Sequence, residues 1–294
     1  MIIDVHTHTT THDLWDLHTK TATLTDLEGL AAQYDVRKII LMATYFPTKG
    51  TGLHNLDLLR RIGESKLFAM CASLNAMTAD GLHIGLQEIS LLAREKMIVG
   101  IKLYPGYQNF HLSDRRIDPL YELAEKYRLP VTVHTGELHH CCPVKDRGEG
   151  RGRCGQVCPI DEWQNLARPS QIIEAATRFP EVNFVLAHLA NPYFSELLYD
   201  VMAVLPNVYT DISGQFRSGT EEATEEYKDE VLAQIKMFIS SGQAGIDRVM
   251  FGTDFPIQSY ADTVDFVERL GLGKEDKEKI YWRNAARLFA LDIG

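Results

Sequence analysis

The chain has 294 residues, of which 45% are hydrophobic and 24% are charged, and its formal net charge at pH 7 is −10. This length and apolar content suffice for a large buried core, and we expect a single domain over residues 1–294. The acidic balance argues against a nucleic-acid-binding protein, and no apolar segment reaches the ~18–20 residues of a membrane span. The sequence shows no basic, apolar leader, which predicts a cytoplasmic protein. We further expect a small-molecule substrate, and a homo-oligomer is possible.

Eight apolar runs rich in β-branched residues recur along the chain. They are nearly continuous rather than alternating, which is typical of parallel strands buried on both faces. The runs span residues 2–5, 36–45, 66–75, 97–105, 130–136, 182–190, 208–214 and 248–256.

The segments between these runs carry apolar residues at helical spacing. Thr25-Asp26-Leu27-Glu28 has the pattern of a capping box, which predicts a helix that ends near Tyr34. Further helices are expected over residues 82–96, 117–128, 169–179, 194–205, 222–241, 261–270 and 274–291. Eight strands alternating with helices predict an α/β protein with a (β/α)8 TIM barrel, and a doubly wound open sheet is the alternative.

Two histidines close the first predicted strand. His6 and His8 are separated by one residue, so on a strand both side chains point to the same face. Two imidazoles directed at one point suit a divalent metal such as zinc. A pair of ordinary histidines would produce the same short pattern, so this motif depends on support from elsewhere in the chain.

Other predicted strands also end in residues that bind metals or transfer protons. Lys102 lies in the fourth run, His134 in the fifth, His188 in the sixth and Asp254 in the eighth. Because barrel enzymes carry their catalytic groups at the carboxyl ends of the strands, these side chains are expected to meet at one face. Asp211, in the seventh run, either supports that group or faces the helices.

Several motifs resemble a known family. They are HTH at 6–8, GIKLYP at 100–105, VHTG at 133–136, AHLA at 187–190, FGTDFP at 251–256 and NAARLF at 284–289. Together they resemble the amidohydrolase superfamily, and in particular its branch called amidohydrolase family 2. The resemblance extends from residue 4 to about residue 291.

The resemblance implies roles for the residues at the strand ends. His6, His8 and His134 would bind a metal, usually zinc, and Asp254 would ligate or closely approach it and act as a proton shuttle. His188 would bind a second metal in a two-metal site, or act as an acid/base or substrate-polarising residue in a one-metal site. Lys102 would be carboxylated and bridge two metals, or it would remain a buried lysine that binds substrate as a cation.

Two further residues are expected to contact the substrate. Tyr104 lies two residues after Lys102 and should share its face, although aromatic packing would explain it equally well. Arg217 lies just beyond the seventh run, where its guanidinium could hold a substrate carboxylate.

The segment at about 137–167 is longer than the ~2–6 residues typical of a strand-to-helix connection. We expect it to form a Cys-rich insertion after the fifth strand and to serve as a lid over the active site. Its cysteines could hold a structural zinc, form disulfides or remain free thiols, because their spacing is not a standard zinc-finger spacing. They are Cys141, Cys142, Cys154 and Cys158.

The resemblance implies a metal-dependent hydrolase in which a zinc-activated water attacks an amide, ester or lactone bond. The alternative within the same family is a metal-dependent nonoxidative decarboxylase or hydratase, a lyase that acts on a carboxylate substrate. A non-enzymatic barrel that uses its cysteine segment to sense metal or redox state or to bind a partner is a second rival. The resemblance favours the hydrolase.

Overall fold

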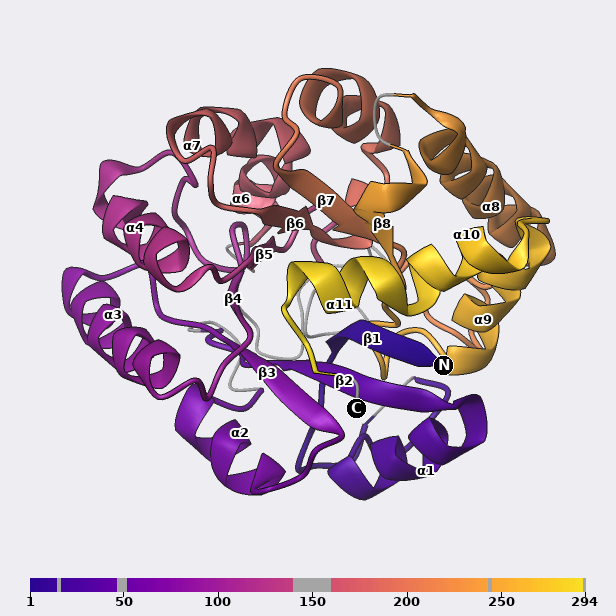
Figure 1. The fold of residues 1–294 in the computed structure, drawn as a ribbon, viewed down its shortest axis with the longest axis horizontal. Coiled ribbons are helices and arrows are strands. Elements are labelled where there is room, and N and C mark those ends of the chain that lie inside the picture. Colours follow the sequence, from indigo (N-terminus) through magenta and orange to yellow (C-terminus); the bar gives the residue numbers. More distant parts are fainter. Residues whose placement is uncertain (15–16, 47–51, 140–159, 243–244, 293–294) are drawn as a thin grey trace.

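The structure is a computed structural model that describes residues 1–14, 17–46, 52–139, 160–242 and 245–292. Its eight strands are parallel and pair in chain order from β1 to β8, so the predicted (β/α)8 TIM barrel is confirmed (Figure 1). The strands are β1 Ile2–Thr7, β2 Val36–Met42, β3 Phe68–Ala72, β4 Gly100–Leu103, β5 Val131–Val133, β6 Phe184–Leu186, β7 Val208–Asp211 and β8 Val249–Met250.

Backbone hydrogen bonds join the two ends of the sheet. The amide of Val5 donates to the carbonyl oxygen of Phe251 over 3.1 Å, and the amide of Asp254 donates to the carbonyl oxygen of His6 over 2.7 Å. The amide of His8 donates to the carbonyl oxygen of Phe255 over 2.8 Å. These bonds continue past the end of β8, and they place the segment around Asp254 beside the two histidines of the first strand.

Helices surround the strands in Figure 1. Each predicted apolar run overlaps one observed strand, and β1 continues two residues beyond the run at 2–5. The sequence analysis did not predict α2, which lies between β2 and β3. The helices are α1 Leu24–Tyr34, α2 Asn55–Ile62, α3 Ala79–Arg94, α4 Asp118–Tyr127, α6 Ile160–Trp163, α7 Ile173–Arg178, α8 Glu225–Ser240, α9 Tyr260–Arg269, α10 Lys274–Glu278 and α11 Asn284–Leu288.

Two of the three buried apolar clusters lie on opposite faces of the strands, because side chains alternate along a strand. In β2, Ile39 and Leu41 pack in the large cluster that includes residues of the surrounding helices, whereas Ile40 and Met42 belong to a second cluster with Ile3 and Val5. This second cluster also contains residues of the last helical segment, namely Ala285, Leu288 and Phe289. Figure 1 shows α11 lying across the end of the barrel from which the strands start.

The first helix begins earlier than the sequence pattern suggested. The predicted cap at Thr25 is wrong: the N-cap of α1 is Thr23, whose hydroxyl accepts from the amide of Asp26 over 3.2 Å. The carboxylate of Asp26 in turn accepts from the amide of Thr23 over 2.8 Å. Asp26 at the third helical position therefore completes the reciprocal box that Glu28 was expected to complete.

Within the described ranges, none of the helices combines the length and the apolar character that a bilayer span requires.

Candidate active site

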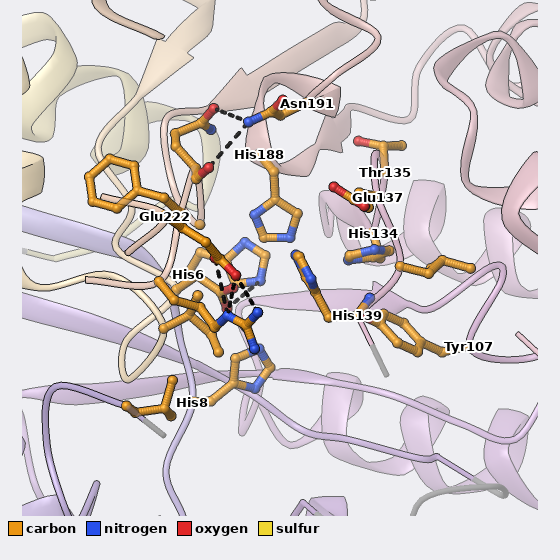
Figure 2. A pocket seen from close by; sticks show the side chains of 18 of the residues that line it. His6, His8, Tyr107, His134, Thr135, Glu137, His139, His188, Asn191 and Glu222 are labelled. Carbon is orange, nitrogen blue, oxygen red and sulfur yellow. Dashed lines mark hydrogen bonds and ion pairs between the residues drawn. The ribbon is translucent and has the colours of Figure 1, made fainter. Parts of the chain in front are cut away.

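A cavity of about 760 Å³ lies at the end of the barrel where the strands finish (Figure 2). Its lining brings together every residue that the sequence analysis assigned to the barrel site. These residues are His6, His8, Lys102, Tyr104, His134, His188, Arg217 and Asp254. A barrel closes the carboxyl ends of its strands into one ring, so residues up to about 250 positions apart in the sequence share one hollow.

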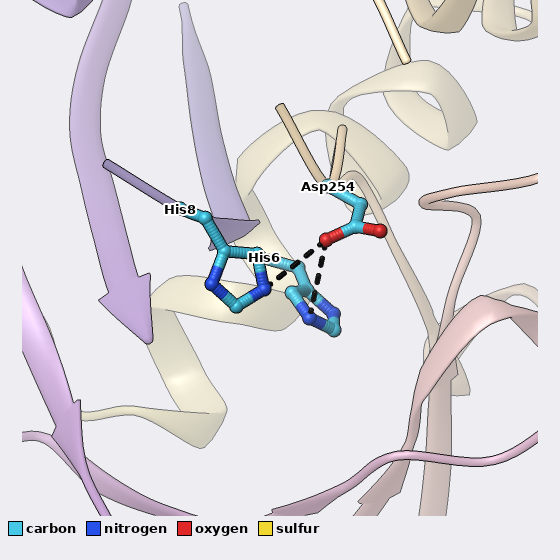
Figure 3. Close-up of side chains that lie close together, drawn as sticks. All are labelled: His6, His8 and Asp254. Atoms are coloured by element: carbon cyan, nitrogen blue, oxygen red, sulfur yellow. Dashed lines mark ion pairs between the residues drawn. The ribbon is translucent and has the colours of Figure 1, made fainter. Parts of the chain in front are cut away.

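His6, His8 and Asp254 form one of two groups of potential metal ligands among the described residues, and His6, His188 and Asp211 form the other (Figure 3 shows the first). Asp254 Oδ1 lies 3.2 Å from His8 Nε2 and 3.8 Å from His6 Nε2. Each residue offers a ligand atom within 4.8 Å of the ligand atoms of the other two. Burial opposes ionisation of Asp254, but the hydrogen bond from His8 and the neighbouring His188 and His6 hold its pKa below the usual range. The group therefore offers one carboxylate and two imidazoles.

His134 and His188 bring two more imidazoles to the cavity. Their ring centroids are 5.1 Å apart. Burial lowers the pKa of His188 to about 3 and that of His134 well below its usual value, with contributions from neighbouring charged groups. Both rings are thus neutral at pH 7, which is the form that binds metal.

Within the described part of the chain, one buried nitrogen of His134 has its hydrogen-bonding capacity unused. Among the described residues, the buried His134 Nε2 has no hydrogen-bond partner. Leaving a buried polar atom unpaired is costly, and native proteins seldom do so. A divalent cation held with His6, His8 and Asp254 would satisfy such a nitrogen, so the residues fit a metal.

His188 lies on a strained turn directly after β6. His188, Leu189 and Ala190 have φ values of 65°, 50° and 53°, a left-handed conformation that non-glycine residues seldom adopt. Neighbouring strands hold the turn: Thr135 Oγ1 donates to the carbonyl oxygen of Ala187 over 2.7 Å, and the amide of His188 donates to Asp211 Oδ1 over 3.0 Å. Such strain persists where the surroundings fix it, and it is frequent at functional sites.

Asp211 and Ser213 lie behind the histidines, at the end of β7. Asp211 is fully buried, and its Oδ2 is 3.2 Å from His6 Nδ1. Ser213 Oγ is 2.9 Å from His188 Nδ1 and donates to Asp211 Oδ1. The sequence left the direction of Asp211 open, and the structure directs its carboxylate toward the site and away from the helices.

Lys102 is fully buried on β4, and its Nζ is 3.2 Å from His6 Nε2. Burial lowers its pKa to about 8, partly offset by the carboxylates of Asp211 and Asp254. Its side chain can therefore place a positive charge beside the histidines, or lose its proton more readily than an exposed lysine. Carboxylation of this lysine stays a prediction.

Aromatic residues form one wall of the cavity. Tyr104 stands edge-on to Phe46, with ring centroids 4.7 Å apart, and Tyr107 lies 5.1 Å from Phe46. The Tyr104 hydroxyl donates to the carbonyl oxygen of Ala43 over 2.9 Å. Tyr104 therefore offers its ring to the cavity, while its hydroxyl is bonded to the backbone.

Arg217 lines the mouth of the cavity and forms an ion pair within the same connection. Its Nε lies 2.9 Å from Glu222 Oε1 and 3.1 Å from Oε2, as the dashed lines of Figure 2 show. The position expected to hold a substrate carboxylate already holds a carboxylate of the protein. A substrate anion would have to compete with Glu222 for this guanidinium.

Several lining residues were missed by the sequence analysis, namely Phe46, Tyr107, Glu137, Asn191 and Glu222. They lie on connections rather than strands, and a sequence carries no periodic signal for the path of a connection. Asn191, labelled in Figure 2, donates to the Tyr227 hydroxyl over 2.8 Å and to Gln215 Oε1 over 3.3 Å.

The predicted Cys-rich insertion falls largely outside the described residues. Cys141, Cys142, Cys154 and Cys158 all belong to this part. The structural zinc, the disulfides and the lid proposed for about 137–167 therefore stay predictions. The remaining cysteine, Cys71, is buried and free, and burial raises its pKa to about 12.

Solved barrels share this fold. One is a dihydroxybenzoic acid decarboxylase from Polaromonas sp. JS666, solved with manganese and the inhibitor 2-nitroresorcinol. It is 16% identical with a TM-score of 0.66, and the match covers 99% of this chain and 97% of that chain. A probable 2-pyrone-4,6-dicarboxylic acid hydrolase from Acinetobacter baumannii, solved with citric acid, is 16% identical with a TM-score of 0.67 and covers 99% of both chains. At these identities the likeness shows the fold.

A curated relative matches part of the sequence. The gamma-resorcylate decarboxylase of Polaromonas sp. is 26% identical over 141 residues, which are 48% of this chain and 33% of that protein. This relative and several of the similar solved barrels are decarboxylases. The expected preference for a hydrolase over a lyase is therefore wrong. The motifs could not separate the classes, since a metal held by histidines and aspartate serves both chemistries.

A sequence profile of the amidohydrolase family matches residues 3–291, almost the entire chain. Five of the six motifs that suggested this family lie on β1, on β4 or at the ends of β5, β6 and β8, and each contributes side chains to one cavity. The sixth, at 284–289, lies on and directly after α11 and packs in the core. The chain belongs to amidohydrolase family 2.

Proposed function

We propose that this protein is a metal-dependent nonoxidative decarboxylase that removes the carboxylate of a small aromatic acid. The observation that carries the proposal is the composition of one cavity, in which a group of potential metal ligands faces an aromatic wall. The decarboxylase names among the similar proteins support it. A volume of about 760 Å³ accommodates a small substrate with a single ring.

His6, His8, His134 and Asp254 would hold the metal, and His188 lies next to them. Zinc suits a set of imidazoles and one carboxylate, and manganese is the ion in one similar barrel. When bound, such a cation would supply positive charge that holds and orients an anionic substrate.

The protein's own groups would orient the substrate. The ammonium group of Lys102 is buried in the cavity wall and can attract a second oxygen of the substrate, such as a carboxylate or phenol oxygen. The rings of Phe46, Tyr104 and Tyr107 offer apolar faces and edges to an aromatic ring. Both contacts become stronger in a cavity from which the substrate excludes water.

Decarboxylation requires a proton at the ring carbon that loses the carboxylate, so that an aryl carboxylate and one proton give the arene and CO₂. Asp254 is an ionised carboxylate at the cavity wall, and it can accept a proton from a substrate hydroxyl and return it to carbon. Neutral His188 can support this transfer through a hydrogen bond. The overall reaction requires no oxidant.

The test is turnover of a panel of hydroxybenzoates by metal-loaded protein, followed as CO₂ release and as loss of ring absorbance. We expect activity with at least one hydroxybenzoate and none with benzoate esters or amides of matched size. Asp254→Asn should lower kcat by about 10²–10⁴-fold, the range expected for loss of an acid–base group.

A matched control is Asp265→Asn, which changes an exposed carboxylate on α9 that is remote from the cavity. It should retain wild-type turnover. Hydrolysis of the esters without CO₂ release from any acid, or normal kcat in the Asp254 variant, would contradict the proposal.

A further inference from the structure

We propose that Asp211 and Ser213 are positioning residues that fix the proton positions on His6 and His188, so that both rings present an unprotonated Nε2 to the cavity. Neither is among the described residues that line the cavity. Both lie behind the histidines, where Asp211 contacts His6 and Ser213 contacts His188. The inference rests on the metal site of the proposed function but does not depend on which reaction that site performs.

Asp211 has a complete set of donors. Its Oδ2 faces His6 Nδ1 at 3.2 Å. Its Oδ1 accepts from the amide of His188 over 3.0 Å, from the amide of Ser213 over 3.2 Å and from the Ser213 hydroxyl. A single buried carboxylate on β7 therefore ties the ligand of β1 to the turn after β6.

These contacts determine the tautomer of His6. A carboxylate can only accept a hydrogen bond, so the Nδ1 that faces Asp211 must carry the proton. On the other side of the ring, Nε2 lies 3.2 Å from Lys102 Nζ. An ammonium group can only donate, so the same tautomer, with a lone pair on Nε2, satisfies both neighbours.

The same reasoning determines the tautomer of His188. Its Nδ1 lies 3.2 Å from the carbonyl oxygen of Ser213 and 2.9 Å from Ser213 Oγ. A carbonyl oxygen can only accept, so Nδ1 carries the proton. Because the Ser213 hydroxyl donates to Asp211, its oxygen is free to accept from His188.

The arrangement matters because a neutral imidazole binds metal through the nitrogen that lacks a proton. The rings of His6 and His188 are 4.7 Å apart, so both lone pairs lie in the same part of the barrel. Partners of this kind fix ring orientation, and their loss lowers metal affinity about 10–100-fold. Asp211 thus prepares the two rings before any cation arrives.

The first variant is Asp211→Asn, which keeps the shape of the side chain. Three donors converge on Oδ1, so we expect the amide oxygen to take that place and the amide NH₂ to face His6. A donor at that position favours the other tautomer of His6, with the proton on Nε2. The affinity of the full chain for Mn²⁺ should then fall about 10–100-fold.

Ser213→Ala gives a graded second variant. It leaves Asp211 facing His6, and it leaves the Ser213 carbonyl oxygen facing His188. Because these two acceptors remain, we expect both tautomers to persist. The variant loses a hydroxyl that lies 3.3 Å from His6 Nδ1 and 2.9 Å from His188 Nδ1, so Mn²⁺ affinity should fall, but less than in Asp211→Asn. The matched control is Thr210→Val, on the same strand, which removes a buried hydroxyl bonded to the carbonyl oxygen of Leu186 and touches neither ring.

Two measurements decide the proposal: imidazole ¹⁵N shifts, assigned with single histidine-to-glutamine variants, and Mn²⁺ titration followed by electron paramagnetic resonance. Protonated Nδ1 on both rings of the wild type, with a proton shift on His6 and weaker Mn²⁺ binding in Asp211→Asn, supports it. A wild-type His6 or His188 protonated on Nε2 overturns it, as does unchanged Mn²⁺ affinity in a folded Asp211→Asn.

If Asp211→Asn fails to fold, two results still test the proposal: the imidazole ¹⁵N shifts of the wild type, and the Mn²⁺ affinity of Ser213→Ala compared with that of Thr210→Val. In that comparison, equal Mn²⁺ affinity of the two variants overturns the proposal. Neither measurement uses a substrate. If the tautomers are as expected but no decarboxylation occurs, only the proposed reaction is contradicted. If decarboxylation occurs but the tautomers differ, only the positioning role is contradicted.

Discussion

At the scale of single residues, the site combines unusual backbone conformations with close side-chain approach. Asp254 and His188 both have positive φ values, 55° and 65°, and Gly214, which lies next to both, has a φ of 59°. These residues come from the ends of three different strands. Hydrogen bonds from neighbouring strands hold the two non-glycine turns: the amide of Asp254 donates to the carbonyl oxygen of His6, and the amide of His188 donates to Asp211 Oδ1.

Replacing Gly214 with alanine should lower turnover. A Cβ at this position would lie 2.8 Å from Asp254 Oδ2 and 2.8 Å from His188 Nδ1, closer than real contacts. Both side chains would have to shift, and a displacement of about 1 Å at a reacting centre can cost about 10²-fold in rate. We expect kcat to fall by at least about 10-fold, measured by steady-state kinetics.

Gly271→Ala provides the comparison for this variant. Gly271 has a φ of 73°, and a Cβ there would meet nothing within 4 Å. It carries a similar backbone penalty, about 1–3 kcal/mol, without a contact to the site. Equal losses of kcat in the two variants would show that strain alone, rather than displacement of Asp254 and His188, causes the effect.

At the scale of elements, side chains at helix starts fix where the helices begin. The first turn of α1 is held by Thr23 and Asp26, and that of α9 by Ser259 and Asp262. Asp262 also reaches across to Lys228 of α8, whose Nζ lies 3.1 Å from Oδ1. Neighbouring helices are thus tied together by the same carboxylate that supports a cap.

Thr23→Ala should lower the free energy of unfolding by about 1 kcal/mol, because it leaves the amide of Asp26 without its acceptor. Thr25→Ala changes an exposed threonine inside the same helix, and alanine has the higher helix propensity. It should therefore be neutral or slightly stabilising. Chemical denaturation of both variants measures the difference, and the reverse order would restore Thr25 as the cap.

The contribution of Asp262 should depend on pH. Burial opposes its ionisation, but hydrogen bonds from Ser218, Ser259 and Lys228 hold its pKa below the usual value near 3.8. A depressed pKa stabilises the fold above the unfolded-state pKa, and this stability is lost as the pH falls through the folded-state pKa. His18 also lies within electrostatic reach of Asp262, so its protonation below neutral pH would add to the attraction in the wild type and not in the variant.

Asp262→Asn should therefore destabilise the protein at pH 7 and progressively less below about pH 4. Denaturation of the wild type and the variant at a series of pH values measures this. A difference that stays constant from pH 7 to pH 3 would exclude the charge of Asp262 as its source.

At the scale of the whole molecule, the two ends of the barrel differ in role: one surrounds the cavity and the other supports the fold. The cavity lies where the strands finish, and α11 covers the end where they start (Figure 1). Phe289, directly after α11, is 3% exposed and packs with Ile3, Val5 and Met250 in the inner core. Residues at that end support the fold, whereas residues at the other end surround the site.

Phe289→Ala should cost about 3–5 kcal/mol of stability, because it opens a cavity beneath the barrel core. In the fraction that stays folded, kcat should remain within about twofold of wild type. Leu91→Ala, on the exposed face of α3 where Leu91 is 49% exposed, should change neither quantity appreciably. Denaturation and kinetics on the same samples separate the effects, and a large loss of kcat in folded Phe289→Ala would contradict the division.

The sequence by itself predicted the barrel and the family, and it named residues that prove to line one cavity. Its near-continuous apolar runs required strands buried on both faces, and parallel strands in a barrel bring their carboxyl ends together. For that reason His6, His134, His188 and Asp254 could be placed in one cavity without coordinates.

Only the tertiary structure decided what surrounds those residues. The direction of Asp211, the bonding of the Tyr104 hydroxyl to Ala43 and the pairing of Arg217 with Glu222 depend on which segments become neighbours across the barrel. Strand and helix periodicity describes one segment at a time, whereas a tautomer, an ion pair or a cavity wall is fixed by contacts between segments. The strand-end motifs could not separate the reaction classes for a further reason, because a metal held by histidines and an aspartate serves both chemistries.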